Sequence, residues 1–242
     1  MTEELFREDA TLHECEAVVV AVDETGVVLD RTVFYPLGGG QAGDAGELLT
    51  PDGRRVAVTD TRKHKERPGA ILHLVAADAP VLQVGDRVTA RIDPDRRRAH
   101  MRFHTATHLL CALIPHPVDG CSITAGYARL DFHMAEPLDK DALTAGIARL
   151  VAAAHPVRHR WISEAELDAN PGLVRSMSVQ PPRGLGRVRV VDIEGVDLQP
   201  CGGTHVANTA DIGAVVVTKI EKKSAMTRRV VLGFAEPGVS PG

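Results

Sequence analysis

The sequence has few aromatic residues, no strong excess of either charge and no long apolar run. Phe, Tyr and Trp make up 3% of its 242 residues, which argues against an aromatic platform for stacking nucleic-acid bases. No apolar run reaches the ~18 residues that a membrane-spanning helix needs. The acidic N-terminal segment MTEELFREDATLHECE lacks the apolar core of a signal peptide, so we expect a cytoplasmic protein. The net charge of −4 argues against a broadly basic nucleic-acid binder but leaves room for local clusters.

Cysteine is also sparse, whereas histidine is abundant. With four cysteines and no export signal, we expect reduced thiols rather than disulfides. The hydrophobic content of 44% and charged content of 25% are typical of globular domains with a buried core. Eleven histidines are present, and five lie close together in the chain: His100, His104, His108, His116 and His133.

The first third of the chain is predicted to be β-rich. Two apolar runs flank residues 23–26, which is typical of a hairpin. Further short strands are predicted at residues 54–60, 71–75 and 87–92. Closely spaced strands without a helical period favour a small barrel or sandwich over residues 1–92.

The pattern changes at Asp93-Pro94, a helix cap followed by proline at the first helical position. We expect a helix from there to just before Pro115, and place a domain boundary near residue 93. Residues 93–242 then read as a mixed α/β, two-layer domain, so the fold class is α+β. Its predicted elements are a helix ending before Pro156, a short helix with a Ser163/Glu166 capping box, a surface loop over 170–186, and strands at 186–193, 213–220 and 228–234.

The chemistry of the chain centres on two distant segments. His104 and His108 are one turn apart on the predicted helix, so their imidazoles can converge on one ion. In PCGGTH, Cys201 and His205 flank two glycines, which allow a sharp turn toward a common point. Three nitrogens and one sulfur form a ligand set that suits a single Zn²⁺.

Purely structural roles are the alternative to a zinc site for these residues. A histidine pair on a helix is often surface or core, and Cys201 could be a plain buried thiol. A metalloprotease of the His-Glu type is excluded, because Thr105 stands where the general-base glutamate would be.

The segments RRRAHMRFHTATHLL and LQPCGGTHVANTADIG resemble the editing domain of alanyl-tRNA synthetase and the free-standing alanyl-tRNA editing proteins called AlaX. FYPLGGGQAGDAG resembles the glycine-rich motif of the longer AlaX type, although Leu37 and Ala42 depart from the family pattern. The likeness covers nearly the whole chain. It implies that residues 93–242 are the zinc-binding editing domain, with His104, His108, Cys201 and His205 as the ligands.

The resemblance implies a hydrolase for translation fidelity: a deacylase acting in trans on tRNA(Ala) that carries a wrong amino acid, chiefly serine and secondarily glycine. The chain is too short to hold an aminoacylation domain as well. The alternative from another class is a zinc-stabilised RNA-binding module without hydrolytic activity. Four protein ligands favour that alternative, since catalytic zinc usually keeps a position open. No DNA or membrane partner is expected, and the oligomeric state is undetermined.

Sparing alanine requires a group that reads the serine hydroxyl. Thr107 matches a pocket threonine of the family and is our first candidate, with Thr105 weaker; either hydroxyl could instead bond to the helix carbonyl four residues earlier. Ser122 and Thr124 stand where relatives have a polar pocket segment. The backbone N–H groups of Gly202, Gly203 and Thr204 are candidates for stabilising the oxyanion.

Contact with tRNA requires positive charge. The candidates on the zinc helix are Arg96, Arg97, Arg98 and Arg102, although a charge run is often only a solvated face. In the glycine-rich motif, we assign Gly38, Gly39, Gly40 and Gln41 to tRNA binding. The glycines could cradle a phosphate through backbone amides or simply form a tight packing turn.

Overall fold

The computed structural model describes residues 1–177, 180–181, 184 and 186–235. The chain divides into two compact units. The first holds Met1–Gly38 and Ala42–Arg98, and the second holds Gly39–Gln41 together with the chain from Ala99 onward. The first unit thus continues past residue 93, while three residues of the glycine-rich motif belong to the second unit. The division at residue 93 into a glycine-motif domain and an editing domain stays a prediction.

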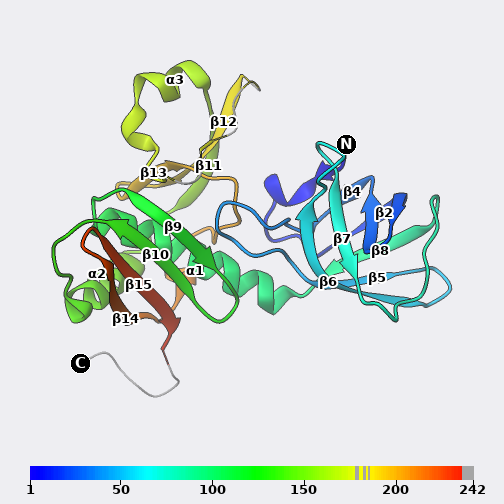
Figure 1. Ribbon diagram of the computed structural model, residues 1–242, viewed down its shortest axis with the longest axis horizontal. Coiled ribbons are helices and arrows are strands. Elements are labelled where there is room, and N and C mark those ends of the chain that lie inside the picture. Colours follow the sequence, from blue (N-terminus) through cyan, green and yellow to red (C-terminus); the bar gives the residue numbers. More distant parts are fainter. Residues whose placement is uncertain (178–179, 182–183, 185, 236–242) are drawn as a thin grey trace. The chain divides into compact units, whose positions relative to one another are not determined.

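The first unit is built on a barrel. Within the described residues, six strands close it in the order β2-β3-β7-β6-β5-β8 (Figure 1). The strands are β2 (Glu14–Asp23), β3 (Gly26–Leu29), β5 (Gly46–Leu49), β6 (Arg55–Lys63), β7 (Ile71–Val75) and β8 (Arg87–Ile92). Inward side chains such as Val19, Leu29 and Leu48 are fully buried. These side chains belong to one continuous core inside the barrel.

Short elements complete the first unit. The strands β1 (Glu3–Glu4) and β4 (Arg31–Thr32) pair in parallel, and the 3₁₀ turn η1 is Leu5–Arg7. Phe6 of η1 packs edge-on against Tyr35, with ring centroids 5.4 Å apart. The predicted hairpin is confirmed, since Asp23 pairs with Gly26. The barrel confirms the predicted β architecture.

The second unit contains a sheet with helices against it. Its described strands run in the order β14-β15-β10-β9, with α1 and α2 on one side (Figure 1). The elements are α1 (Pro94–Leu113), β9 (Val118–Ile123), β10 (Ala128–His133), α2 (Lys140–Ala152), β14 (Val215–Ser224) and β15 (Thr227–Phe234). Phe103 of α1 stacks on Phe234 of β15, with centroids 4.0 Å apart. This arrangement is the two-layer α+β packing that the sequence predicts.

A smaller sheet leads into the segment that contains Cys201 and His205. It has the order β11-β12-β13, formed by β11 (Val157–Ser163), β12 (Arg187–Ile193) and β13 (Asp197–Pro200). The helix α3 (Glu164–Ala169) packs on it through Leu167, next to Ile162 and Val190. The Ser163/Glu166 capping box that starts α3 is present as predicted.

Two 3₁₀ turns complete the second unit: η2 is Pro171–Leu173 and η3 is Thr209–Ile212. The predicted loop at 170–186 thus includes η2, and its residues 178–179, 182–183 and 185 lie outside the described part of the chain. In the parts that the structure describes, no helix has the length and apolar character to cross a bilayer.

Candidate metal centre

The helix α1 and the segment after β13 bring four ligand-type side chains together. Asp93 caps α1 as predicted, accepting hydrogen bonds from the backbone N–H groups of Asp95 and Arg96 at 3.0 Å each. The helix then presents His104 and His108 on one face, with ring centroids 5.6 Å apart. β13 ends at Pro200 and the chain turns directly into Cys201. The two predicted segments therefore converge.

The geometry of the cluster fits zinc. The ligand atoms of His104, His108, Cys201 and His205 all lie within 4.8 Å of one another. The Cys201 Sγ is 3.4 Å from His104 Nε2 and 3.3 Å from His205 Nε2. Tetrahedral Zn²⁺ with ordinary bond lengths would separate sulfur and nitrogen ligands by about 3.6 Å. These two separations are within a few tenths of an ångström of that value, and the donor set is one that zinc prefers.

Each imidazole has its outer nitrogen held by a different group. His108 Nδ1 lies 2.8 Å from Asp197 Oδ2, and His104 Nδ1 lies 2.8 Å from Gln41 Oε1. His205 Nδ1 lies 3.1 Å from Thr105 Oγ1. Because each acceptor occupies Nδ1, all three rings leave Nε2 for a metal ion.

The Thr105 hydroxyl shows how one such contact is fixed. It donates to the carbonyl of Met101 at 2.9 Å, which confirms the predicted bond to the carbonyl four residues earlier. Its lone pairs then accept from Val206 N–H at 3.3 Å and from His205 Nδ1. A hydroxyl has a single proton, so His205 must supply the hydrogen from Nδ1.

The electrostatics of the cluster favour the metal-binding forms of Cys201 and His205, whereas His108 would have to release a proton to bind an ion. Burial alone would raise the pKa of the Cys201 thiol, yet neighbouring His104 and His205 hold that pKa well below its usual value. Burial, reinforced by His104, lowers the pKa of His205 to about 3. Burial opposes protonation of His108, but Asp197 and Cys201 outweigh it and raise its pKa to about 10. A thiolate beside imidazoles is the state that binds a soft divalent ion.

The other cysteines of this unit differ from Cys201. Burial raises the pKa of the Cys111 thiol to about 12, and burial likewise raises that of Cys121 to about 12. Both remain protonated thiols at neutral pH. All four cysteines are free in the structure.

The turn through the two glycines requires Gly203. A Cβ at this position would lie 2.2 Å from His104 Cε1 and 2.9 Å from Gln41 Oε1. Arg189 holds the same turn from β12, donating from Nη1 to the carbonyls of Cys201 and Gly203 at 2.8 and 3.2 Å. The loop is thus pressed against α1 without room for a side chain.

The predicted pocket residues occupy different environments. Thr107 is buried on α1 and donates to the His104 carbonyl at 2.7 Å, three residues earlier. Ser122 is half-buried on β9, opposite Arg129. Thr124 closes the turn between β9 and β10, donating to the Tyr127 carbonyl at 3.0 Å. Thr107 is therefore the one of these three whose hydroxyl lies next to a ligand in the chain and is also buried.

Two of the proposed oxyanion donors are already engaged. The Thr204 N–H donates to Gln41 Oε1 at 3.1 Å, and the Gly203 N–H points at Cys201 Sγ at 3.4 Å. Gly202 is exposed. For Gly203 and Thr204 the oxyanion role stays a prediction that requires exchanging these bonds for one to a substrate.

Comparison with known proteins places this site in a family. The family model described as "Threonyl and Alanyl tRNA synthetase second additional domain" matches residues 188–231, and that described as "tRNA synthetases class II (A)" matches residues 6–96. The chain is 37% identical to "Alanyl-tRNA editing protein AlaX-M" of Methanosarcina barkeri over 241 residues, covering 95% of this chain and 98% of the relative. The protein of the same name from Saccharolobus solfataricus is 35% identical over 238 residues, with 95% and 98% coverage. The chain belongs to the AlaX-M family.

A longer relative contains the same region. The "Alanine--tRNA ligase" of Pyrococcus furiosus is 34% identical over 249 residues, which cover 98% of this chain but 26% of the ligase. The resemblance to AlaX proteins identified from the sequence is confirmed across almost the entire chain.

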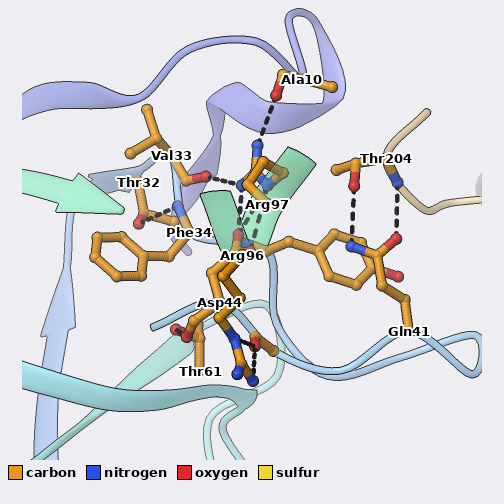
Figure 2. Close-up of polar contacts among 12 residues, drawn as sticks. Ala10, Thr32, Val33, Phe34, Gln41, Asp44, Thr61, Arg96, Arg97 and Thr204 are labelled. Carbon is orange, nitrogen blue, oxygen red and sulfur yellow. Dashed lines mark hydrogen bonds and ion pairs between the residues drawn. The ribbon is translucent and has the colours of Figure 1, made fainter. Parts of the chain in front are cut away.

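The arginines assigned to tRNA binding in this AlaX-M chain differ in exposure. Arg98 is exposed, and Arg96 is half-buried with its guanidinium on the Gly43 carbonyl. Arg97 is only 1% exposed and pairs with Asp44, while also donating to the carbonyls of Val33 and Ala10 at 2.6 and 2.7 Å (Figure 2). This burial argues against a phosphate contact at Arg97.

Arg102 lies on the other side of the unit boundary within α1. Its Nε donates to the Ile212 carbonyl at 2.6 Å, and its guanidinium lies 4.0 Å from the Phe234 ring centroid. These contacts give Arg102 a packing role in the second unit. Arg98 is therefore the candidate of the four that is most open to a phosphate.

The glycine-rich motif of this AlaX-M chain is only partly exposed. Gly38 and Gly40 are half-buried and Gly39 is exposed, whereas Gln41 is fully buried. Leu37, one of the two departures from the family pattern, is 48% exposed. A contact between tRNA and Gly38, Gly39 or Gly40 stays a prediction, and the burial of Gln41 argues against such a contact there.

Sequence reasoning missed the residues that hold the imidazoles through Nδ1. Asp197 lies four residues before Cys201, and an acidic residue so close to a ligand is a usable signal. Gln41 lies 63 residues from His104, so only its place in the glycine-rich motif marked it.

Proposed function

We propose that the protein deacylates mischarged tRNA(Ala) in trans, hydrolysing the ester of a wrong amino acid, chiefly serine and secondarily glycine. The observation that carries the proposal is the His104–His108–Cys201–His205 cluster in a chain that aligns along 98% of an AlaX-M relative. We further propose one Zn²⁺ per chain at that cluster. When bound, the ion supplies Lewis-acid polarisation or orientation of the substrate.

The residues of the chain supply the remaining parts. The Thr107 hydroxyl donates its hydrogen to the His104 carbonyl, so its oxygen can still accept a hydrogen bond from a serine hydroxyl. Alanine lacks that hydroxyl and would leave the buried oxygen unpaired. A site built in this way can discriminate by about 10⁴–10⁵. The Gly202 N–H and the exposed Arg98 are proposed to contact the ester oxygen and a phosphate, respectively.

The decisive experiment compares hydrolysis of Ser-, Gly- and Ala-tRNA(Ala) by the purified protein. We expect Ser-tRNA(Ala) to be cleaved far faster than Ala-tRNA(Ala). Zinc content is measured on the same sample. A zinc-loaded protein that binds tRNA but cleaves none of the three would overturn the proposal and favour the RNA-binding module. That alternative draws support from the four protein ligands, which would leave a bound zinc ion without an open position.

A further inference from the structure

The three imidazoles of the cluster obtain their Nδ1 partners from different parts of the chain. Thr105 is on α1 with two of the ligands, and Asp197 begins the strand that leads to Cys201. Gln41 is on neither segment: it belongs to the three-residue stretch Gly39–Gln41 that forms part of the second unit. Its contact with His104 therefore joins a third segment to the metal centre.

The orientation of the Gln41 amide is determined by its contacts. The backbone N–H of Thr204 can only donate, and it points at Gln41 Oε1 at 3.1 Å. On the other side of the amide, Gln41 Nε2 donates to Thr204 Oγ1 at 2.9 Å (Figure 2). Rotating the amide by half a turn would set its NH₂ group against the Thr204 N–H. The oxygen of Gln41 is therefore the atom that faces His104.

This orientation sets the tautomer of His104. Because Oε1 has no hydrogen, the 2.8 Å contact requires a hydrogen on His104 Nδ1. The lone pair of the neutral ring then lies on Nε2, which is 3.4 Å from Cys201 Sγ. The same oxygen accepts from Thr204, which lies between the ligands Cys201 and His205. One amide thus connects the two halves of the cluster.

The segment that carries Gln41 is anchored. The Ile123 N–H donates to the Gly40 carbonyl at 2.7 Å, and Gln41 forms a bridge with the same residue of β9. Gly40 has φ of 84°, and a Cβ there would lie 2.7 Å from Cys121 Sγ. Gln41 is 0% exposed, so its amide has no water to replace a lost partner.

We propose that Gln41 is a positioning residue of the metal centre, which selects the Nδ1–H tautomer of His104 and ties the Cys201–His205 loop to α1. The inference rests on the zinc site of the proposed function but not on the deacylation. It also explains the glutamine of the glycine-rich motif without a contact to tRNA.

The test measures zinc affinity of the full-length protein by titration against a competing chelator, without tRNA. Gln41→Leu removes the acceptor, and we expect the dissociation constant for Zn²⁺ to rise about 10- to 100-fold. Gln41→Glu keeps an acceptor for both donors, and we expect affinity within about threefold of the parent on the same physical ground. The matched control is Thr209→Val, which removes a buried hydroxyl of the same unit that bonds to the Leu150 carbonyl, and leaves affinity unchanged.

Nitrogen-15 NMR of the histidine rings reports the tautomer of His104, which a general loss of protein stability would not change. In the zinc form, the parent and Gln41→Glu should show His104 with its hydrogen on Nδ1. In Gln41→Leu, the ring should no longer be fixed in this one tautomer. Wild-type affinity in Gln41→Leu, or an equal loss in Gln41→Glu and Gln41→Leu, would overturn the inference. Absence of zinc binding by the parent would overturn it too. If Gln41→Leu loses zinc affinity but the parent does not cleave Ser-tRNA(Ala), the positioning role of Gln41 stands and the proposed deacylation is refuted.

Discussion

At the scale of single residues, two threonine hydroxyls near the cluster differ in their hydrogen bonds. Thr105 and Thr107 are two positions apart on α1. Thr105 has both lone pairs occupied by Val206 and His205. Thr107 donates to a helix carbonyl and retains lone pairs that can accept. This difference favours Thr107 over Thr105 as the group that reads a substrate hydroxyl.

Thr107→Val tests that role. Valine keeps the shape of the side chain and removes the acceptor, so the Ser-tRNA(Ala) to Ala-tRNA(Ala) rate ratio should fall by at least about tenfold. The measurement is single-turnover hydrolysis of both substrates. Thr144→Val on α2, which removes the half-buried hydroxyl that accepts from the Val217 N–H of β14, is the matched control and should leave the ratio unchanged. An unaltered ratio in Thr107→Val would remove Thr107 from this role.

His73 makes the stability of the barrel depend on pH. Its Nε2 lies 2.8 Å from Thr32 Oγ1 and its Nδ1 lies 3.2 Å from the Val27 carbonyl, which suits a neutral ring. Burial lowers the pKa of His73 to about 4 from the usual 6.5. The unfolded chain therefore binds a proton as pH falls below 6.5, while the folded chain does not until about 4. Stability is fully present above pH 6.5 and is lost across this window.

We expect His73 to account for a loss of up to about 3 kcal/mol between those pH values. Urea unfolding of the parent and of His73→Gln over this range measures it. Subtracting the two curves removes the contribution of the carboxylates. Parallel curves would contradict the prediction.

At the scale of elements, the sequence predicts those parts whose pattern is local. The strands β7 and β8 match their predicted bounds: β7 is a short apolar run, and in β8 the buried Val88, Ala90 and Ile92 alternate with polar residues. The strand β11 was missed: its run Arg158 to Trp161 is exposed, so no alternation marks it. The hairpin of β9 and β10 is not among the predicted strands, since only the family resemblance marks this segment, as part of a polar pocket. β13 ends in Pro200, a residue that argues against a strand.

The candidate site shows the same limit. The ligand types and the one-turn spacing on α1 are readable from the sequence, because they depend on local geometry. Which residue holds which ring through Nδ1 is not readable, because Asp197 lies 89 residues and Gln41 lies 63 residues from the rings they contact. Only the folded chain reveals such pairs.

The turn after β13 gives a prediction at this scale. Gly203→Ala places a methyl group 2.2 Å from His104 Cε1, so we expect loss of zinc binding by at least about tenfold. Gly202 is exposed, and Gly202→Ala retains the backbone N–H, which makes it the matched control. Metal analysis after dialysis compares the two variants. Equal zinc content would refute the claim that the turn has no room for a side chain.

At the scale of the whole molecule, the two units have separate means of stabilisation. The barrel encloses its own apolar core, while the second unit contains all four residues of the cluster. A metal that binds only the folded state adds to the stability of the unit that holds it. The two units should therefore respond differently to a chelator.

Chelation should raise amide hydrogen exchange in α1 after Arg98, in β13 and in the turn that follows. Exchange in β2, β3 and β7 of the barrel should remain as in the zinc form. Mass spectrometry of peptides before and after treatment with chelator, with zinc added back, measures this. Uniform loss of protection across both units would contradict it.

The placement of Gly39–Gln41 in the second unit bears on how the protein can be divided. A fragment cloned from Ala99 onward would retain every ligand and yet lack the amide that orients His104. We therefore expect this fragment to bind zinc more weakly than the full chain does. The region shared with the Pyrococcus furiosus ligase spans 98% of this chain and so includes the residues of both units.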